Sequence, residues 1–124
     1  MAEEVWRWPE ELDALRAAPR QHRLMLENDR VRVLDTRVAA GETVPLHTHR
    51  WPAALYVVSW SDCVRRDETG AVVMDSRLAQ RNPDTIALWC PPLGPHTLDN
   101  VGVSELRVIV VELKDASDET SATA

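Results

Sequence analysis

The stretch Gly41-Glu-Thr-Val-Pro-Leu-His47-Thr-His49 decides how this sequence is interpreted. On a β-strand, residues i and i+2 point to the same face, so His47 and His49 can reach one metal ion from one strand. A third histidine, His96, follows in residues 89–100, WCPPLGPHTLDN. If a neighbouring strand delivers His96, the three imidazoles complete a face of metal ligands. The sequence therefore predicts a small metal-binding β-barrel.

The chain around these histidines has the pattern of an antiparallel barrel or sandwich. Short runs rich in Val, Leu and Thr alternate with turn signals at regular intervals. The turn residues include Glu27-Asn28-Asp29 and the hairpin connection Asp67-Glu68-Thr69-Gly70. The runs predict an all-β fold with strands near residues 22–27, 30–39, 44–49, 54–60, 62–67, 71–76, 84–90, 95–100 and 104–113.

Length and end composition predict one domain with two appendages. At 124 residues the chain is long enough for one core. Residues 1–21 are expected to form an N-terminal extension with a short helix from Pro9 to Ala18, and residues 22–114 the barrel. Residues 115–124 are small, polar and acidic, which predicts disorder.

The charge distribution and the cysteine content indicate which partners and which cellular compartment to expect. The net charge of −6 comes from the ends, because residues 20–114 carry 12 basic and 12 acidic residues. The barrel region thus has no basic surplus for phosphate backbones, and nucleic-acid binding is not expected. The chain has no apolar run of about 18 residues and no signal-peptide pattern at its start. Cys63 and Cys90 lack CxxC spacing, which fits a reducing cytoplasm.

The two histidine segments resemble the two motifs of the cupin superfamily. The matching positions are Gly41, His47, His49, Pro91, His96 and Asn100. The resemblance covers roughly residues 22–113. It implies a jelly-roll barrel, the double-stranded β-helix, with a metal held by the motif histidines. It also implies a homodimer.

The sequence departs from the motifs at one position that matters for chemistry. The acidic ligand should fall at Ala53 or Ala54, and neither can bind a metal. The predicted centre therefore has three neutral ligands, His47, His49 and His96. Zinc accepts such a set in catalytic sites, and the resemblance to thiol dioxygenases and diketone-cleaving cupins permits iron(II). Nickel, copper and manganese remain open.

The positions after His49 predict the surroundings of the metal. If Ala53 points into the barrel, so do Leu55, Val57 and Ser59. Tyr56 and Trp60 then face away, and the interior near the metal is largely apolar. The space over Ala53 is a place for a substrate carboxylate or carbonyl group.

Five other positions are candidates for a role at or near the site. Arg50 is either a partner for a substrate carboxylate or a solvated charge, and Trp51 a pocket wall. For Trp89, core packing is favoured over a pocket wall. His22, outside both motifs, is assigned to ordinary packing, and Arg65 to the surface or an interface.

Two functions follow from this pattern. The first is an enzyme in which the metal acts as a Lewis acid or oxygen-activating site on a small carboxylate- or carbonyl-bearing molecule. No general base is visible in the sequence. The second is a non-catalytic cupin that binds a metal or ligand for sensing, or stabilises a partner protein.

Overall fold

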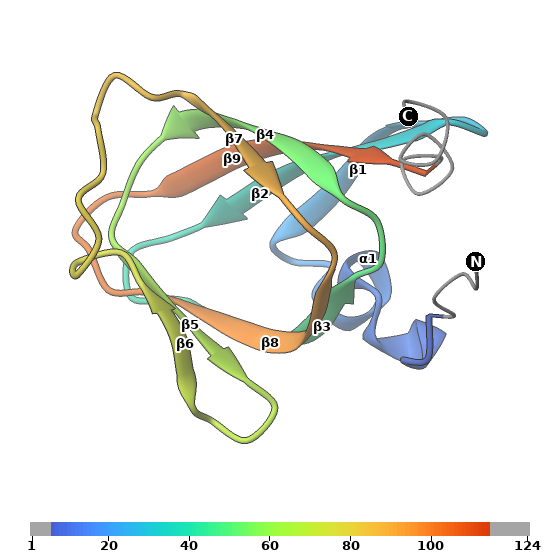
Figure 1. Cartoon of the computed structure of the whole chain (residues 1–124), viewed down its shortest axis with the longest axis horizontal. Helices are drawn as coiled ribbons and strands as arrows, with labels where there is room; N and C mark the ends of the chain where they lie inside the picture. Colours follow the sequence, from blue (N-terminus) through green and yellow to red (C-terminus); the bar gives the residue numbers. More distant parts are fainter. Residues whose placement is uncertain (1–5, 115–124) are drawn as a thin grey trace, which may run out of the picture.

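The computed structural model describes residues 6–114, so the disorder predicted for residues 115–124 lies outside the described residues. Its strands form two antiparallel sheets that face each other (Figure 1). The five-stranded sheet has the order β1-β2-β9-β4-β7, and the four-stranded sheet the order β3-β8-β5-β6. The strands are β1 (His22–Glu27), β2 (Val31–Val38), β3 (Thr43–His49), β4 (Ala53–Ser59), β5 (Cys63–Asp67), β6 (Val72–Asp75), β7 (Ala87–Cys90), β8 (Leu93–Asn100) and β9 (Leu106–Leu113). The predicted all-β fold and all nine predicted strands are confirmed, with boundaries that differ by three residues at most.

The turns form where the sequence predicts them. The side chain of Asn28 accepts hydrogen bonds from the backbone N–H groups of Arg30 and Val31, which closes the β1–β2 turn. Gly70 has a φ of +90° in the β5–β6 hairpin, a conformation that favours glycine.

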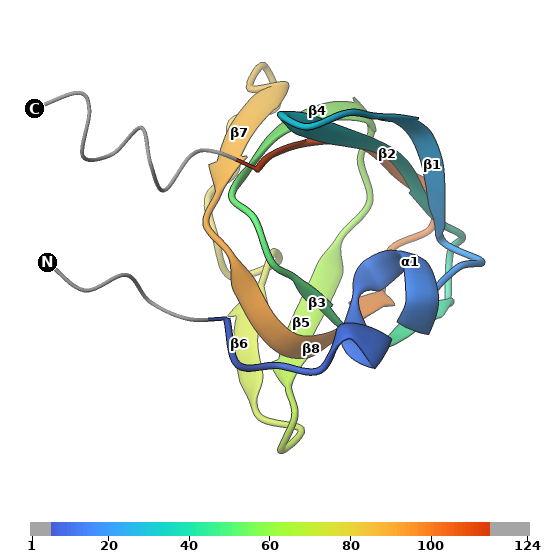
Figure 2. The same cartoon turned by 90° about the vertical axis from the view of Figure 1, so that its right-hand side faces the viewer.

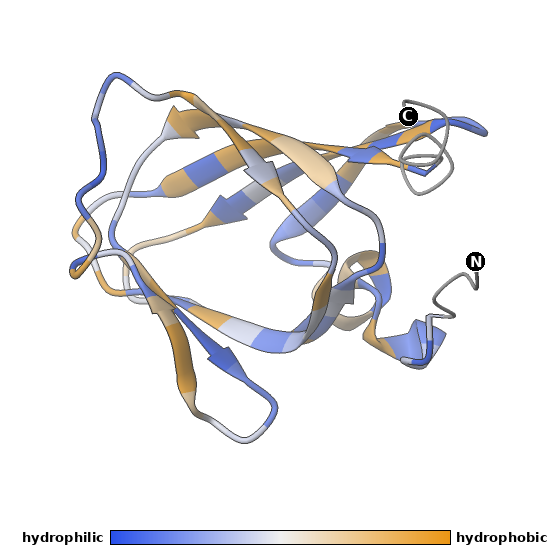
Figure 3. Ribbon diagram, in the orientation of Figure 1, coloured by the Kyte–Doolittle hydropathy of each residue, from blue (hydrophilic) through white to orange (hydrophobic). Residues whose placement is uncertain are grey.

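The apolar core fills the space between the two sheets. Along β2 and β4, buried side chains alternate with more exposed ones over much of the strand, and Figure 3 shows hydrophobic residues on both sheets. Two groups of buried residues make up the core: Ala18, Val38, Val44, Cys63 and Leu106, and Ala14, Leu34, Ala53 and Val110. The second group lies beside the histidine-bearing part of the barrel, because it includes Ala53.

The N-terminal segment contains two short helices where one was expected. A 3-10 helix, η1 (Glu10–Leu12), is followed by α1 (Ala14–Ala17), and Asp13 separates them. Asp13 has an extended backbone, its carboxylate caps α1 by accepting from the N–H of Leu15, and it bridges to Thr48 on β3. The cap breaks the predicted helix and brings the segment against one end of the barrel (Figure 2). No helix in the described part of the chain is long and apolar enough to cross a membrane.

The side chains of β4 alternate between the inward and outward faces as predicted. Ala53 and Val57 are buried and Tyr56 is half exposed, as expected. The strand ends at Ser59, so the alternation that predicts an outward side chain no longer applies at the next residue, Trp60. The outward orientation predicted for Trp60 is therefore wrong: its ring packs against the core and lies 4.3 Å from the Arg81 guanidinium.

Candidate metal centre

The structure brings the three predicted ligands together. His47 and His49 both point into the barrel from β3, and their ring centroids are 5.0 Å apart. His96 is the direct partner of His47 across the β3–β8 ladder, with ring centroids 4.2 Å apart. The convergence expected from the His-x-His spacing and the second motif is thus present.

A fourth histidine belongs to the same cluster. The ring of His22 lies 4.9 Å from that of His47 and 5.4 Å from that of His49. Potential ligand atoms of these three residues all lie within 4.8 Å of one another. The assignment of His22 to ordinary packing away from the site is wrong. No motif spacing links it to the others, because it arrives on β1, which enters the five-stranded sheet from the N-terminal segment.

Backbone carbonyl groups set the tautomer of three histidines in the cluster. The Nδ1 atoms of these rings lie at hydrogen-bond distance from carbonyl oxygens: His22 from Ala18 (3.0 Å), His47 from Pro45 (2.8 Å) and His96 from Gly94 (2.7 Å). A carbonyl oxygen can only accept, so Nδ1 carries the hydrogen and Nε2 keeps its lone pair. Histidines that bind a metal through one ring nitrogen commonly donate the N–H of the other to such an acceptor.

The same three imidazoles are neutral at neutral pH. Burial is the main cause, with a smaller contribution from the neighbouring histidines, and together they lower the pKa of His22 to about 4, that of His47 to about 2 and that of His96 to about 3. A neutral imidazole with a free Nε2 lone pair is the form that binds a metal.

The Nδ1 atom of His49 faces a carboxylate oxygen rather than a backbone carbonyl oxygen. Its Nδ1 lies 3.1 Å from an oxygen of Glu112, a fully buried residue on β9. The other Glu112 oxygen accepts from Nε of Arg32 at 2.5 Å. Burial by itself would raise the pKa of the Glu112 carboxyl, but the hydrogen bonds from His49 and Arg32 outweigh it and hold the pKa below its usual range.

Glu112 and Arg32 also correct the expectation of a largely apolar interior near the metal. Both side chains lie on the inward face of the five-stranded sheet. The sequence offers one signal for Glu112, an acidic residue inside the apolar run 106–113, LRVIVVEL. A charge in such a run is rarely buried without a partner.

Arg65 also faces the interior. Its charge contributes to lowering the pKa of His96. The expectation of a surface or interface charge is wrong, because β5 pairs Arg65 with Leu98, which lies on the same face of β8 as His96.

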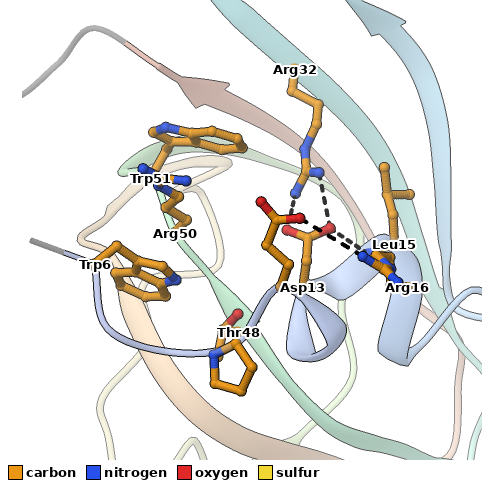
Figure 4. Close-up of a pocket in the computed structure, with 10 residues that line it drawn as sticks. Trp6, Asp13, Leu15, Arg16, Arg32, Thr48, Arg50 and Trp51 are labelled. Carbon is orange, nitrogen blue, oxygen red and sulfur yellow. Dashed lines mark hydrogen bonds and ion pairs between the residues drawn. The ribbon is translucent and has the colours of Figure 1, made fainter.

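A pocket of about 290 Å³ opens at the end of the barrel where α1 lies, and none of the four histidines is among the residues that line it (Figure 4). Arg50 and Trp51 line it, as do Arg32 and Asp13. The Trp51 ring lies 5.1 Å from the guanidinium of Arg32 and 5.6 Å from that of Arg50. The remaining lining residues are Trp6, Pro9, Glu10, Leu15, Arg16 and Thr48.

The other predicted pocket residues divide between the two faces of the sheet. Ala53 is 4% exposed and faces the interior, and Leu55 is partly buried on the same side. Trp89 is 59% exposed on β7, where it pairs with the outward-facing Ala54. The interpretation of Trp89 as core packing is wrong.

The buried histidines predict how stability depends on pH. In the unfolded chain they titrate near 6.5, whereas the fold holds the pKa of His22 at about 4. Below pH 6.5 the unfolded chain binds more protons, so the free energy of unfolding of the metal-free protein should fall as the pH drops. The expected loss is on the order of 2 kcal/mol per buried histidine by about pH 5.

Urea unfolding in the presence of a chelator, between neutral pH and about pH 5, measures this loss. The buried carboxylates have lowered pKa values, so in the folded protein they take up protons only below this pH range. A His22→Asn variant should show a smaller loss. A free energy of unfolding that stays constant over this range would contradict the prediction.

Comparisons with known proteins support the fold. No family model and no curated protein matches the chain. Among solved structures, it is similar to a cupin domain from Bordetella pertussis Tohama I (TM-score 0.59, 18% identity), over 75% of this chain and 91% of that one. An RmlC-like cupin with a double-stranded β-helix fold from Methanocaldococcus jannaschii gives a TM-score of 0.54 at 12% identity, covering 97% and 98%.

The polyketide cyclase RemF from Streptomyces resistomycificus is similar too, with a TM-score of 0.51 and 20% identity over 92% of this chain and 80% of that one. At these identities the similarity concerns the fold. The chain therefore has the cupin fold, a double-stranded β-helix, as its two histidine motifs predict.

Proposed function

We propose that this chain is a metal-binding cupin whose histidine cluster holds one divalent transition metal. The observation that supports this most directly is that all four imidazoles have the same hydrogen-bonding arrangement. Each has its Nδ1 engaged by an oxygen acceptor, which leaves four Nε2 lone pairs within one buried cluster. An all-imidazole set suits zinc or iron(II), and also copper and nickel. Bound there, the metal would supply Lewis-acid or oxygen-activating chemistry.

Every ring contact of the cluster involves His47 or His49. His96 completes the set of the cupin motifs, whereas His22 forms a group with His47 and His49 whose ligand atoms lie within 4.8 Å of one another. We propose His47, His49 and His96 as ligands, with His22 as a fourth donor.

Single substitutions test the metal site and its ligand set. Asparagine can still donate a hydrogen bond from a position close to that of Nδ1, but it has no counterpart of Nε2. We expect the protein to bind one equivalent of zinc or iron(II), measured by elemental analysis and equilibrium dialysis. His47→Asn and His96→Asn should weaken binding by more than the roughly 10–100-fold that losing an outer-shell partner costs.

An Arg23→Asn variant, changed at an exposed position on β1, should bind as the wild type does and serves as the control. If His96→Asn binds normally and His22→Asn does not, the ligand set is His22, His47 and His49. Wild-type protein that holds far less than one equivalent refutes the proposal.

We propose further that the cluster acts on a small molecule bearing a carboxylate or carbonyl group. Two features support an anionic ligand. Arg50 and Trp51 line the pocket at the end of the barrel, and Arg65 faces His96 from inside. RemF, an enzyme with this fold, shows that the fold can house catalysis, but the proposal here depends on the site.

One observation favours the alternative, a non-catalytic binding module. Glu112 is the carboxylate nearest to the cluster, and each of its oxygens already accepts a hydrogen bond. It therefore offers no free general base. Catalysis would need a base from the metal-bound solvent or from the substrate.

Binding and turnover of small carboxylic and carbonyl compounds by the metal-loaded protein separate the two functions. We expect Arg50→Ala and Arg65→Met each to weaken binding of a carboxylate about tenfold, since a charge-assisted hydrogen bond contributes about 1.5–3 kcal/mol. Calorimetry measures the affinity, with Arg23→Ala as a control for losing one positive charge. Product detected by mass spectrometry supports the enzyme, and binding without product supports the module. Equal affinity in all variants contradicts this assignment of the anion site.

We propose a homodimer that forms through the outer face of the five-stranded sheet. One register row on this face is apolar across all five strands: Trp89, Ala54, Val111, Val33 and Leu26. Trp89 is 59% exposed, Leu26 51% and the neighbouring Tyr56 50%. Such a continuous apolar row is typical of a surface that another copy covers. Cys63 and Cys90 are free thiols, in keeping with the cytoplasmic location that we also propose.

Light scattering measures the oligomeric state directly. Wild-type protein should be a dimer, and Trp89→Glu should shift it to a monomer because a charge would be buried in the contact. Val103→Glu places the same charge at a 98% exposed position outside this row and should remain dimeric. A monomeric wild type would contradict the dimer.

A further inference from the structure

The carboxylate that the first motif lacks is present one strand away. Ala53 on β4 is the direct register partner of Glu112 on β9. Directly opposed residues in an antiparallel pair share one face, with Cβ atoms about 4.5–5.5 Å apart. Both residues are buried, Ala53 at 4% and Glu112 at 0% exposure. Glu112 thus lies next to Ala53, where the motif has its acidic ligand, and on the same inward face.

Glu112 contacts the cluster through one histidine. Its Oε2 lies 3.1 Å from Nδ1 of His49. His22, His47 and His96 obtain the same contact from backbone carbonyls, which no substitution can remove. His49 alone among the four obtains it from a side chain, so its tautomer depends on the residue at position 112.

Arg32 keeps this carboxylate in place and ionised. Its Nε donates to Oε1 of Glu112, while its two terminal nitrogens donate to the Asp13 carboxylate at 3.0 and 2.8 Å. With Oε1 held by Arg32, Oε2 is the oxygen that faces His49. The bidentate contact to Asp13 in turn fixes the guanidinium plane.

We propose that Glu112 is the positioning residue of the candidate metal centre. It holds His49 in the form that carries the hydrogen on Nδ1 and directs the Nε2 lone pair into the cluster, and it supplies the negative charge that the motif position lacks. The effect on metal affinity rests on the proposed metal-binding function. The effect on the His49 tautomer does not, and it can be measured without metal.

The first test is the imidazole ¹⁵N NMR spectrum of the metal-free protein. In the wild type, His49 should show a protonated Nδ1 and an unprotonated Nε2. In Glu112→Gln, Arg32 retains the single side-chain oxygen, so the amide NH₂ turns toward His49. His49 should then change to the Nε2–H tautomer, while His22, His47 and His96 keep theirs.

The second test is metal affinity, measured by competition with a chelator. Glu112→Gln should weaken zinc binding about 10–100-fold, as is usual for the loss of an outer-shell partner. Asp35→Asn is the matched control. Asp35 is 3% exposed on the outer face of the same sheet and is paired with Arg37 and Arg107, so the variant loses a buried charge remote from the histidines. Its tautomers and affinity should equal those of the wild type.

The outcomes separate this inference from the proposed function. An Nε2–H tautomer of His49 in the wild type overturns it, and this result does not require the variant to fold. A Glu112→Gln loss as large as that of His47→Asn, with the His49 tautomer unchanged, makes Glu112 a direct ligand and also overturns it. If the wild type binds no metal but the tautomer result holds, the metal function fails and the positioning of His49 stands.

Discussion

The buried ion pair between Arg32 and Glu112 is the interaction on which the arrangement of this site depends. Removing either charge from water costs several kcal/mol, and the pair compensates only when the remaining donors and acceptors are also satisfied. Here they are, because Arg32 reaches Asp13 and Glu112 reaches His49. Loss of one member of such a pair typically costs about 3–5 kcal/mol, since it leaves the other charge buried alone. The pair therefore ties the N-terminal segment, the five-stranded sheet and the histidine strand into one unit.

The barrel divides into an apolar part and a polar part, and single strands contribute to both. Val44 on β3 packs in the core, whereas His47 and His49 farther along the same strand belong to the cluster. The β3–β8 ladder has register irregularities between Val44 and His47 and again before His49. β-Bulges are common next to functional sites, where they redirect side chains. The core thus forms a rigid base from which the imidazoles are presented.

The parts of this structure that sequence could predict are those with a local pattern. Runs of Val, Leu and Thr between turn signals located every strand, and the His-x-His spacing located His47 and His49. The arrival of His96 beside His47 followed from the second motif. Trp60 was misplaced because β4 ends at Ser59, one residue before the predicted end, so the alternation of side chains does not extend to it.

Two residues of the site were not predicted from the sequence, and the cause is different. His22 and Glu112 reach the cluster through strand order: β1 and β9 lie outside both motifs and enter the site through pairing in the five-stranded sheet. Local periodicity specifies a face of a strand but not its neighbours. An acidic residue in the apolar strand 106–113 was the one local sign that a buried charge needed a partner.

The N-terminal segment has a consequence for how ligands reach the site. Asp13 both caps α1 and occupies two donors of Arg32, a residue that also lines the pocket. It thereby acts as an intramolecular competitor for that guanidinium. Because it is tethered, its effective concentration is far above that of a free solute, so a ligand anion must displace it before it can bind Arg32. Selectivity for small acids would then depend as much on the hold of the first helix as on the barrel itself.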